Sequence, residues 1–308
     1  MVITRTLTDS VSASTATHIQ LGSCATDIRD GAFSGYRNIT EIGPIGSGAS
    51  VEIPDSLATI GKSAFSGCTN LSSVTIGSGV TSFDNSAFSG CTRLSAAYLN
   101  SDAAVGHLVN DTLRYVLTAV TIGDSVTTIG DSAFRESYSL TSVTIGSGVT
   151  TIGQSAFEDC SGLTSVIIPD SVTTLNHGAF QGCSILTSVT IGSGVTTIGQ
   201  SAFAGCRSLP NITIPDSVRT IGRKAFQYCI GLSSVTIGSG VTTIDQSAFR
   251  VCSRLTSITC MAETPPTLAS DAFDDTNNCP IYVPAASVNV YKAATNWSRY
   301  ASRIQPIP

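Results

Sequence analysis

An 18-residue segment that occurs twice without change is the feature that most constrains this chain. Residues 140–157 read LTSVTIGSGVTTIGQSAF, and residues 186–203, which begin 46 positions later, are identical. A close copy, LTSVIIPDSVTTLNHGAF, spans 163–180, so the period of the repeat is half of that offset, or 23. Self-similarity at a fixed period of this length predicts a stack of structural repeats, here called rungs, rather than two unrelated domains.

The dipeptide Ala-Phe marks the phase of the repeat. Its phenylalanines recur at steps of 23 from Phe134 to Phe249, whereas the step from Phe88 to Phe134 is 46. The longer step predicts a complete but irregular rung in which Asp111 takes the phenylalanine position. A step of 32 before Phe65 predicts a nine-residue insertion near 43–51.

Each rung has a strand-like half and a turn-like half. The β-branched stretch LTSVTI predicts a short strand, and the IGSG or IPDS that follows is typical of a turn. VTTIG predicts a brief extended or 3₁₀ segment, and the apolar spacing in 202–209 predicts one or two turns of helix. One rung cannot bury its own apolar residues, so the strands of successive rungs are expected to pair in parallel. The predicted fold is therefore an α/β solenoid of about 11 rungs with one curved parallel β-sheet.

The pattern L-x-x-V-x-I-[PG]-x-[SG]-V-x-x-I-G-x-x-A-F-x-x-C recurs from about residue 25 to 283 and resembles the BspA-like leucine-rich repeat family of bacterial surface proteins. The C-terminal stretch that begins CMAETPP resembles the ending of such proteins from gut Bacteroidetes. The resemblance implies a leucine-rich-repeat horseshoe or solenoid, a location at the cell surface or outside the cell, and adhesion or host interaction. The insertion, the irregular rung and the lack of an export signal depart from the family pattern.

A single domain in three parts is expected: an irregular N-terminal cap over 1–24, the solenoid over 25–283 and a C-terminal cap over 284–308. Residues 281–283 should add a last strand, 285–294 a helix, and Trp297 should pack over the final rung, because a terminal rung otherwise exposes core.

Composition excludes several classes of function. The net charge of −5 without a basic run argues against nucleic acid as a partner. The chain has no run of 18 apolar residues, so no membrane span is predicted. The N-terminus lacks the apolar region of a signal peptide, so either the protein is cytoplasmic or an export signal lies outside this chain.

Most of the ten cysteines follow the repeat. We expect a buried, reduced ladder, because stacked parallel side chains point the same way and a free cysteine is at home in a core. The expected core columns are Phe157, Phe180, Phe203, Phe226 and Phe249, with Cys160, Cys183, Cys206, Cys229 and Cys252; Cys68 and Cys91 extend the cysteine column.

Cys260 and Cys279 lie outside that column, beside the modified last rung. A disulfide between them and two separate thiols both remain open, and Cys24 has no obvious partner. There is no CxxC and no Cys–His cluster, so we expect neither zinc nor another cofactor.

No catalytic residues are predicted. The three histidines, His18, His107 and His177, have no metal-ligand spacing, and no nucleophile–base set can be assembled from them. Asp55, Asp124, Asp170 and Asp216 recur after the strand, where they favour a turn-stabilising role; a calcium role is the alternative.

Two surfaces are candidates for binding. The outward side chains of the strands form flat Ser and Thr columns, which include Thr144, Thr190, Thr213 and Thr236. The irregular rung, 94–116, carries polar and aromatic residues that suggest either a remodelled contact site or a decayed repeat: Tyr98, His107, Asn110, Asp111, Arg114 and Tyr115.

The expected function is a non-enzymatic, monomeric surface protein that binds a host or neighbouring-cell protein or glycan through the solenoid face. A purely structural spacer is the first alternative. A hydrolase site in the irregular rung and an ice-binding row formed by Thr150, Thr173, Thr196 and Thr242 are two further alternatives.

Overall fold

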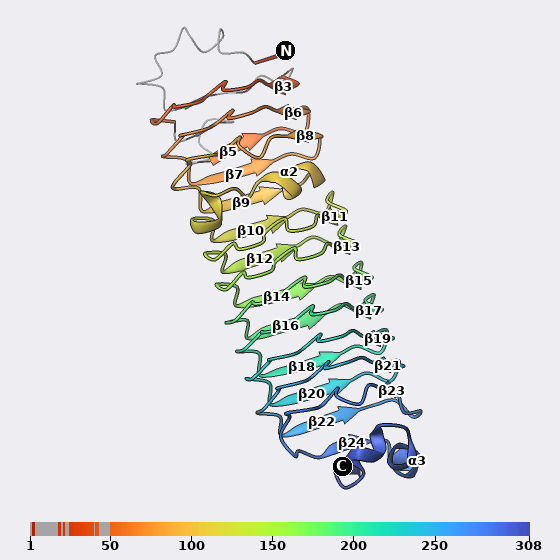
Figure 1. Cartoon of the computed structure of the whole chain (residues 1–308). Coiled ribbons are helices and arrows are strands. Elements are labelled where there is room, and N and C mark those ends of the chain that lie inside the picture. Colours follow the sequence, from red (N-terminus) through yellow and green to blue (C-terminus); the bar gives the residue numbers. More distant parts are fainter. Residues whose placement is uncertain (1, 4–17, 20, 22–24, 40, 43–49) are drawn as a thin grey trace. The chain divides into compact units, whose positions relative to one another are not determined.

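The computed structural model describes residues 2–3, 18–19, 21, 25–39, 41–42 and 50–308 (Figure 1). They divide into two compact units, Met1–Val149 and Thr150–Pro308, each described by itself below. Each unit is a parallel β-solenoid, in which successive rungs contribute a long and a short strand to two separate sheets. The predicted solenoid class is confirmed. Most of the expected N-terminal cap, and Cys24, lie outside the described residues.

In unit 1 the long-strand sheet has the order β2-β4-β5-β7-β9-β10-β12, and the short-strand sheet has the order β1-β3-β6-β8. The bounds are β1 Val2–Ile3, β2 His18–Ile19, β3 Asp27–Ile28, β4 Glu41–Ile42, β5 Ser50–Ile53, β6 Thr59–Ile60, β7 Ser73–Ile76, β8 Ser82–Phe83, β9 Ala96–Leu99, α2 Asp102–His107, η1 Leu113–Tyr115, β10 Ala119–Ile122, β11 Thr128–Ile129 and β12 Ser142–Ile145. Ile42 pairs with Val51, nine residues on, so the insertion adds a strand to the long-strand sheet.

In unit 2 the short-strand sheet runs β13-β15-β17-β19-β21-β23, and the long strands form the ladders β14-β16 and β18-β20-β22-β24-β25. The bounds are β13 Thr151–Ile152, β14 Ser165–Ile168, β15 Thr174–Leu175, β16 Ser188–Ile191, β17 Thr197–Ile198, β18 Asn211–Ile214, β19 Thr220–Ile221, β20 Ser234–Ile237, β21 Thr243–Ile244, β22 Ser257–Cys260, β23 Thr267–Leu268, β24 Ile281–Val283, η2 Ala285–Ser287, α3 Val288–Ala293, η3 Trp297–Tyr300 and β25 Ile304–Pro306. The ladder is interrupted before β18, where Pro210 has no N–H to donate to the preceding rung.

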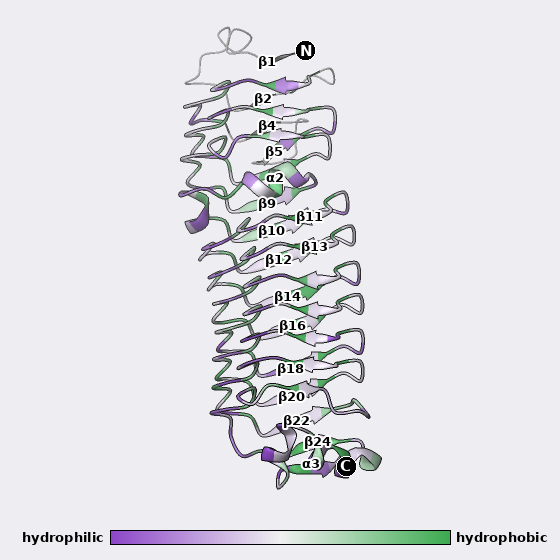
Figure 2. Ribbon diagram, turned by 45° about the vertical axis from the view of Figure 1, so that its right-hand side comes forward, coloured by the Kyte–Doolittle hydropathy of each residue, from purple (hydrophilic) through white to green (hydrophobic). Residues whose placement is uncertain are grey.

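The register of both sheets follows the repeat. Val166 pairs with Val189 and Thr174 with Thr197, each one period further along the chain, so equivalent positions stack. Hydrophobic residues therefore recur at the same places in successive rungs of each unit (Figure 2). The short-strand sheet is a difference from our prediction of a single sheet face. It forms because Thr-Ile in VTTIG is β-branched and its isoleucine is buried.

The helical turns predicted for 202–209 are wrong. Tight turns replace them: the N–H groups of Ala204, Cys206 and Leu209 donate to oxygens three residues earlier. Ser201, just before this segment, has a φ of 55°. In the equivalent turn of the next rung, Tyr228, two residues after Phe226, has a φ of 62°. Left-handed residues at these positions prevent a helix from continuing. The Phe203 N–H instead donates to the Ala225 oxygen of the next rung, at 2.8 Å.

The phenylalanines form one stacked, fully buried column within unit 2. The rings of Phe157 and Phe180 have centroids 5.1 Å apart with planes 3° from parallel, and the spacing from Phe180 to Phe203 is 5.4 Å. Trp297 continues the column at its end: its ring is 6.0 Å from Phe273, and its Nε1 donates to the Pro266 oxygen. The predicted plug is therefore present, with α3 and β25 completing the cap.

The column cysteines are buried thiols that link rungs. The Sγ of Cys183 donates to the oxygen of Phe157 in the preceding rung at 3.3 Å, and Cys229 makes the same contact with Phe203 at 3.2 Å. Burial raises the pKa of Cys229 to about 12. In unit 1, Ser137 takes the cysteine position and is fully buried, but its hydroxyl has no hydrogen-bond partner among the described residues. The rung before it is the irregular one, which lacks the phenylalanine turn.

No disulfide joins Cys260 to Cys279. Both thiols are free: Cys260 contacts the Tyr291 hydroxyl at 3.2 Å, and Cys279 contacts Arg303. The register explains the separation. Because Thr259 pairs with Tyr282, Cys260 lies opposite Val283, about four residues or ~13 Å along the strand from Cys279. That distance is well beyond disulfide reach.

Between residues 54 and 240, except in the irregular rung, the turns after the long strands alternate between two sequences. Each aspartate of a PDS or GDS turn accepts from the serine of the GSG turn in the next rung, as Asp170 does from the Ser193 N–H at 2.6 Å and hydroxyl at 3.0 Å. A Cβ on Gly194 would overlap the Asp170 carbonyl oxygen. Glycine is therefore required wherever an aspartate turn lies in the preceding rung, and these carboxylates act in turns, as predicted.

Candidate functional site

The outward face of the long-strand sheet carries columns of residues in register. In unit 1 one column runs Thr75, Tyr98, Thr121 and Thr144. In unit 2 the equivalent positions pair Ile167 with Thr190, and Thr213 with Thr236 and then Thr259. Along each strand, the residues that alternate with these outward positions point inward and are mostly buried, as the geometry of a β-strand requires.

The hydroxyls on this face are available to a partner. Among the described residues, the Thr144, Thr190, Thr213 and Thr236 side chains make no hydrogen bond. A rigid sheet therefore presents rows of free donors and acceptors whose spacing is set by the backbone.

Threonines at other positions of the rung do form side-chain hydrogen bonds, although their sequence context is similar. The Oγ1 of Thr187 donates to the Thr164 oxygen of the preceding rung at 3.0 Å, and Thr196 donates to the Thr173 oxygen at 3.1 Å. Thr242 does the same with the Arg219 oxygen. A hydroxyl has only one proton to donate, so the row that suggested an ice-binding surface uses part of its hydrogen bonding to hold rungs together.

The irregular rung does not bring its six predicted residues into one site. Its helix α2 packs beside β8 and β11, in the place of a short strand, while η1 lies at the opposite edge of the unit (Figure 1). Ser101 caps α2, since its Oγ accepts from the Ala104 N–H. His107 is exposed at the C-terminal end of α2, and Tyr98 lies on the long-strand sheet.

Asn110 has a structural role. Its Oδ1 accepts from the N–H groups of Thr112 and Leu113 at 3.0 and 3.1 Å, and its Nδ2 donates to the Asn85 oxygen. These bonds position η1, so Asn110 is not free to bind a partner. Asp111 is fully exposed and pairs with Arg114 at 3.2 Å.

An exposed aromatic pair lies at the η1 edge. The Tyr115 and Tyr138 rings have centroids 5.7 Å apart and are 60% and 39% exposed. Arg114 donates to the Glu136 carboxylate beside them at 2.8 Å. Sequence reasoning missed Tyr138. Its position one full repeat after Tyr115 is the signal that could have found it.

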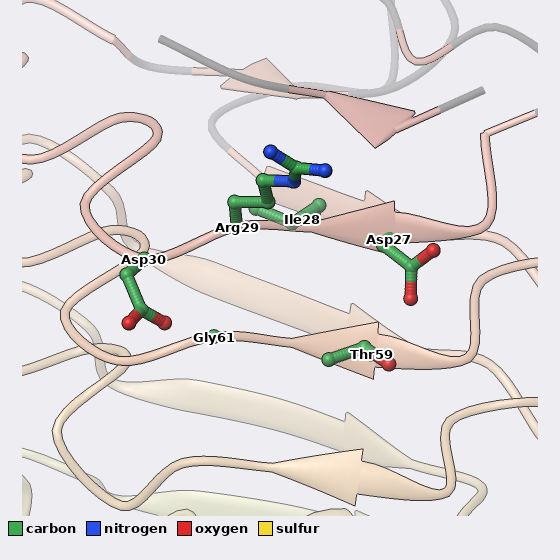
Figure 3. A pocket seen from close by; sticks show the side chains of 6 residues that line it. All are labelled: Asp27, Ile28, Arg29, Asp30, Thr59 and Gly61. Carbon is green, nitrogen blue, oxygen red and sulfur yellow. The ribbon is translucent and has the colours of Figure 1, made fainter.

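Pockets give little support to catalysis. The pocket in Figure 3, of about 510 Å³, lies in unit 1 beside β3 and β6. Asp27 and Asp30 lie at its two ends and do not converge. Hydrogen bonds from the hydroxyls of Thr59 and Thr26 lower the pKa of Asp27, and Asp30 accepts from the Lys62 N–H at 2.8 Å. Both carboxylates therefore already accept hydrogen bonds from neighbouring residues of the chain.

Two more pockets lie in unit 2. One, of about 580 Å³, is formed by the loop at Met261–Thr267, and the other, of about 530 Å³, by the turn at Phe273 and the end of the chain. Neither His107 nor His177 lines any of these three pockets. Among the described residues, no cluster of His, Cys, Asp or Glu could hold a metal ion. No helix in the described part of the chain is long and apolar enough to cross a bilayer.

The sequence matches a known repeat family over most of its length. The BspA type Leucine rich repeat region matches in six copies over residues 45–107, 114–230 and 173–298. No curated protein matches the chain.

Three solved structures are similar to this chain, and the first of those named here shows the same fold. A leucine-rich repeat protein from Bacteroides ovatus is 19% identical with a TM-score of 0.51, and the match covers 94% of this chain and 92% of that one. A leucine-rich repeat protein from Eubacterium ventriosum is 20% identical (84% and 82% covered, TM-score 0.48). A leucine rich cell surface protein from Faecalibacterium prausnitzii is 22% identical (95% and 92% covered, TM-score 0.39).

Proposed function

The chain belongs to the BspA-type leucine-rich repeat family, and we propose that it is a non-catalytic scaffold that binds a protein or glycan through the outward face of its long-strand sheet. The proposal places it at the cell surface or outside the cell, as the resemblance to bacterial surface proteins implies. Adhesion is the biological role that follows from such binding.

One observation carries the proposal: the outward hydroxyls of Thr190, Thr213 and Thr236 make no hydrogen bond among the described residues, while the threonines at the starts of the strands are engaged between rungs. Many weak polar contacts from a preformed face cost little ordering entropy, because the strands are already fixed. A spacer would have no need of an unengaged face, although threonine also suits exposed strands on its own account.

The test uses arrays of extracellular-matrix proteins and glycans with the intact protein. A triple variant, Thr190→Arg, Thr213→Arg and Thr236→Arg, places long charged side chains on the face and should abolish the interactions seen with the parent protein. Its matched control carries the same three charges on the exposed positions Thr173→Arg, Gln200→Arg and Gln246→Arg.

Two results would count against the proposal. If no probe binds the parent protein, the spacer function is favoured. If the triple variant binds as the parent does, the long-strand face is not the site. Tyr98→Ala and Arg114→Ala are then tested separately, because these two residues lie on different surfaces of unit 1.

A further inference from the structure

The pocket at the end of unit 2, called the cap pocket, contains a buried polar group without a partner. It is lined by Phe273, Asp274, Asn278, Arg299, Tyr300 and Arg303, among others, and its volume of about 530 Å³ lies within the range of small-molecule sites. Tyr300 is only 8% exposed, and its hydroxyl makes no hydrogen bond among the described residues. Buried hydroxyls in folded proteins are nearly always paired, so this one indicates a missing partner.

The Tyr300 ring is held in place. It packs edge-on against Phe273 with centroids 5.8 Å apart, and the Arg303 guanidinium lies 5.3 Å from the ring centroid. In the other rungs of unit 2 the equivalent phenylalanine donates its N–H to the next rung, as Phe226 does to Ala248. Phe273 is the last phenylalanine of the column, and Tyr300 occupies the space that another rung would fill.

The pocket offers both donors and acceptors. Arg303 uses its Nε on the Cys279 oxygen at 2.7 Å and one terminal nitrogen on the Cys279 thiol, which leaves further N–H groups. Arg299 donates one N–H to the Ser270 oxygen. The half-buried Asp274 carboxylate has no hydrogen bond among the described residues. Burial, and after it the charge of Asp274, raises the pKa of Tyr300, whereas Arg299, Arg303 and the nearby Phe273 backbone act in the opposite direction.

The mixture of donors and acceptors selects the kind of ligand. Arg299 and Arg303 supply N–H donors, and Asp274 supplies the free carboxylate, since Asp275 is paired with Arg250 at 3.1 Å. A phosphate or other strong anion could bind the arginines but would lie against the Asp274 carboxylate, which repels it. A neutral ligand rich in hydroxyls can pair with both the arginine N–H donors and the Asp274 carboxylate, because each hydroxyl donates one hydrogen bond and accepts two.

We propose that the cap pocket binds one neutral sugar residue, with adjacent hydroxyls bridging the Asp274 carboxylate, the Tyr300 hydroxyl and the free N–H groups of Arg303. This site is separate from the long-strand face, and neither proposal depends on the other.

The test is ligand-observed NMR on the full chain with three probes, the methyl glycosides of glucose, galactose and mannose, and with acetate and glycine as a carboxylate and a zwitterion. At least one glycoside should bind. Tyr300→Phe keeps the ring and removes only the unpaired hydroxyl, so it should weaken sugar binding at least ~10-fold while leaving the melting temperature unchanged or higher. Asp274→Asn should weaken binding by a similar factor.

Two controls separate this site from the others. Tyr228→Phe makes the same change at an exposed tyrosine of unit 2 and should leave sugar binding unchanged. The triple arginine variant of the long-strand face should also keep it, so either proposal can fail alone. Binding of acetate or glycine without any glycoside, no binding at all, or full sugar binding by the folded Tyr300→Phe protein would each overturn the proposal.

Discussion

Hydroxyl groups in this protein have different roles that depend on their position in the rung. Those at the starts of the strands donate to the preceding rung, Thr187 being one case, and those on the outward face, such as Thr190, have no partner within the described chain. Alternation along the strand was enough to predict which threonines face outward. Which of them are engaged depends on where the carbonyl of the neighbouring rung lies, and a single rung's sequence does not contain that information.

Ser137 is a residue-scale defect that substitution should relieve. Its buried hydroxyl lacks the carbonyl that the column cysteines use, so removing it avoids a desolvation cost. Ser137→Ala should raise the free energy of unfolding by about 1 kcal/mol, measured by urea denaturation. Ser125→Ala, at an exposed serine of the same unit, should change it by less than about 0.5 kcal/mol. Destabilisation by Ser137→Ala would show that the hydroxyl has a partner after all.

At the scale of elements, the strands were easier to predict than the turns. Four-residue strands such as β16 follow from β-branched sequences with period-two burial. The turn at 202–209 has helix-like apolar spacing, but the rung-to-rung bond from Phe203 and the left-handed residue Ser201 require a different backbone. The irregular rung was located correctly by its lost phenylalanine. Its division between α2 and η1 could not be predicted, because it depends on how α2 packs between the short strands of the neighbouring rungs.

Glycines in the turns and in α2 should respond in opposite ways to the same substitution. Gly194→Ala places a methyl group onto the Asp170 backbone, so it should destabilise by at least about 1–3 kcal/mol, the range typical of overpacking. Gly106→Ala is the matched control: a Cβ there meets nothing within 4 Å, and alanine in a helix should stabilise by roughly 0.5–1 kcal/mol. Thermal unfolding measures both. Equal effects would contradict the tight packing of the turns.

At the scale of the whole molecule, the acidic turns should make stability fall in acid. Hydrogen bonds from the backbone N–H of Ser193 and of Ser239 are the main causes that lower the pKa values of Asp170 and Asp216. The folded pKa is then below the unfolded value of about 3.9. The stabilisation is complete above that value and is lost as the pH falls through the folded pKa, because the unfolded state then binds more protons.

Urea midpoints measured between neutral and acid pH test this expectation. The double variant Asp170→Asn and Asp216→Asn should lose less stability in acid than the parent protein, since its turns do not titrate. Asp245→Asn removes an exposed carboxylate whose side chain makes no hydrogen bond in the described chain, so it should leave the acid dependence as it is. Identical acid profiles for all three proteins would exclude the turn carboxylates as its source.

The alternation of aspartate and glycine turns has a consequence for how such a chain can change length. A GSG turn packs against the PDS or GDS turn of the preceding rung. Its serine donates to the aspartate carboxylate, and its last glycine leaves space for the aspartate carbonyl, as Ser193 and Gly194 do for Asp170. Duplicating a single rung would place two turns of one kind in succession and leave either a serine without its carboxylate or an aspartate without its serine. Duplication or deletion of two rungs preserves every pairing. From Asp124 to Gly240 the structural repeat is therefore a pair of rungs, which is also the offset between the two identical segments; the irregular rung breaks this alternation, since it places Asp124 three rungs after Asp55.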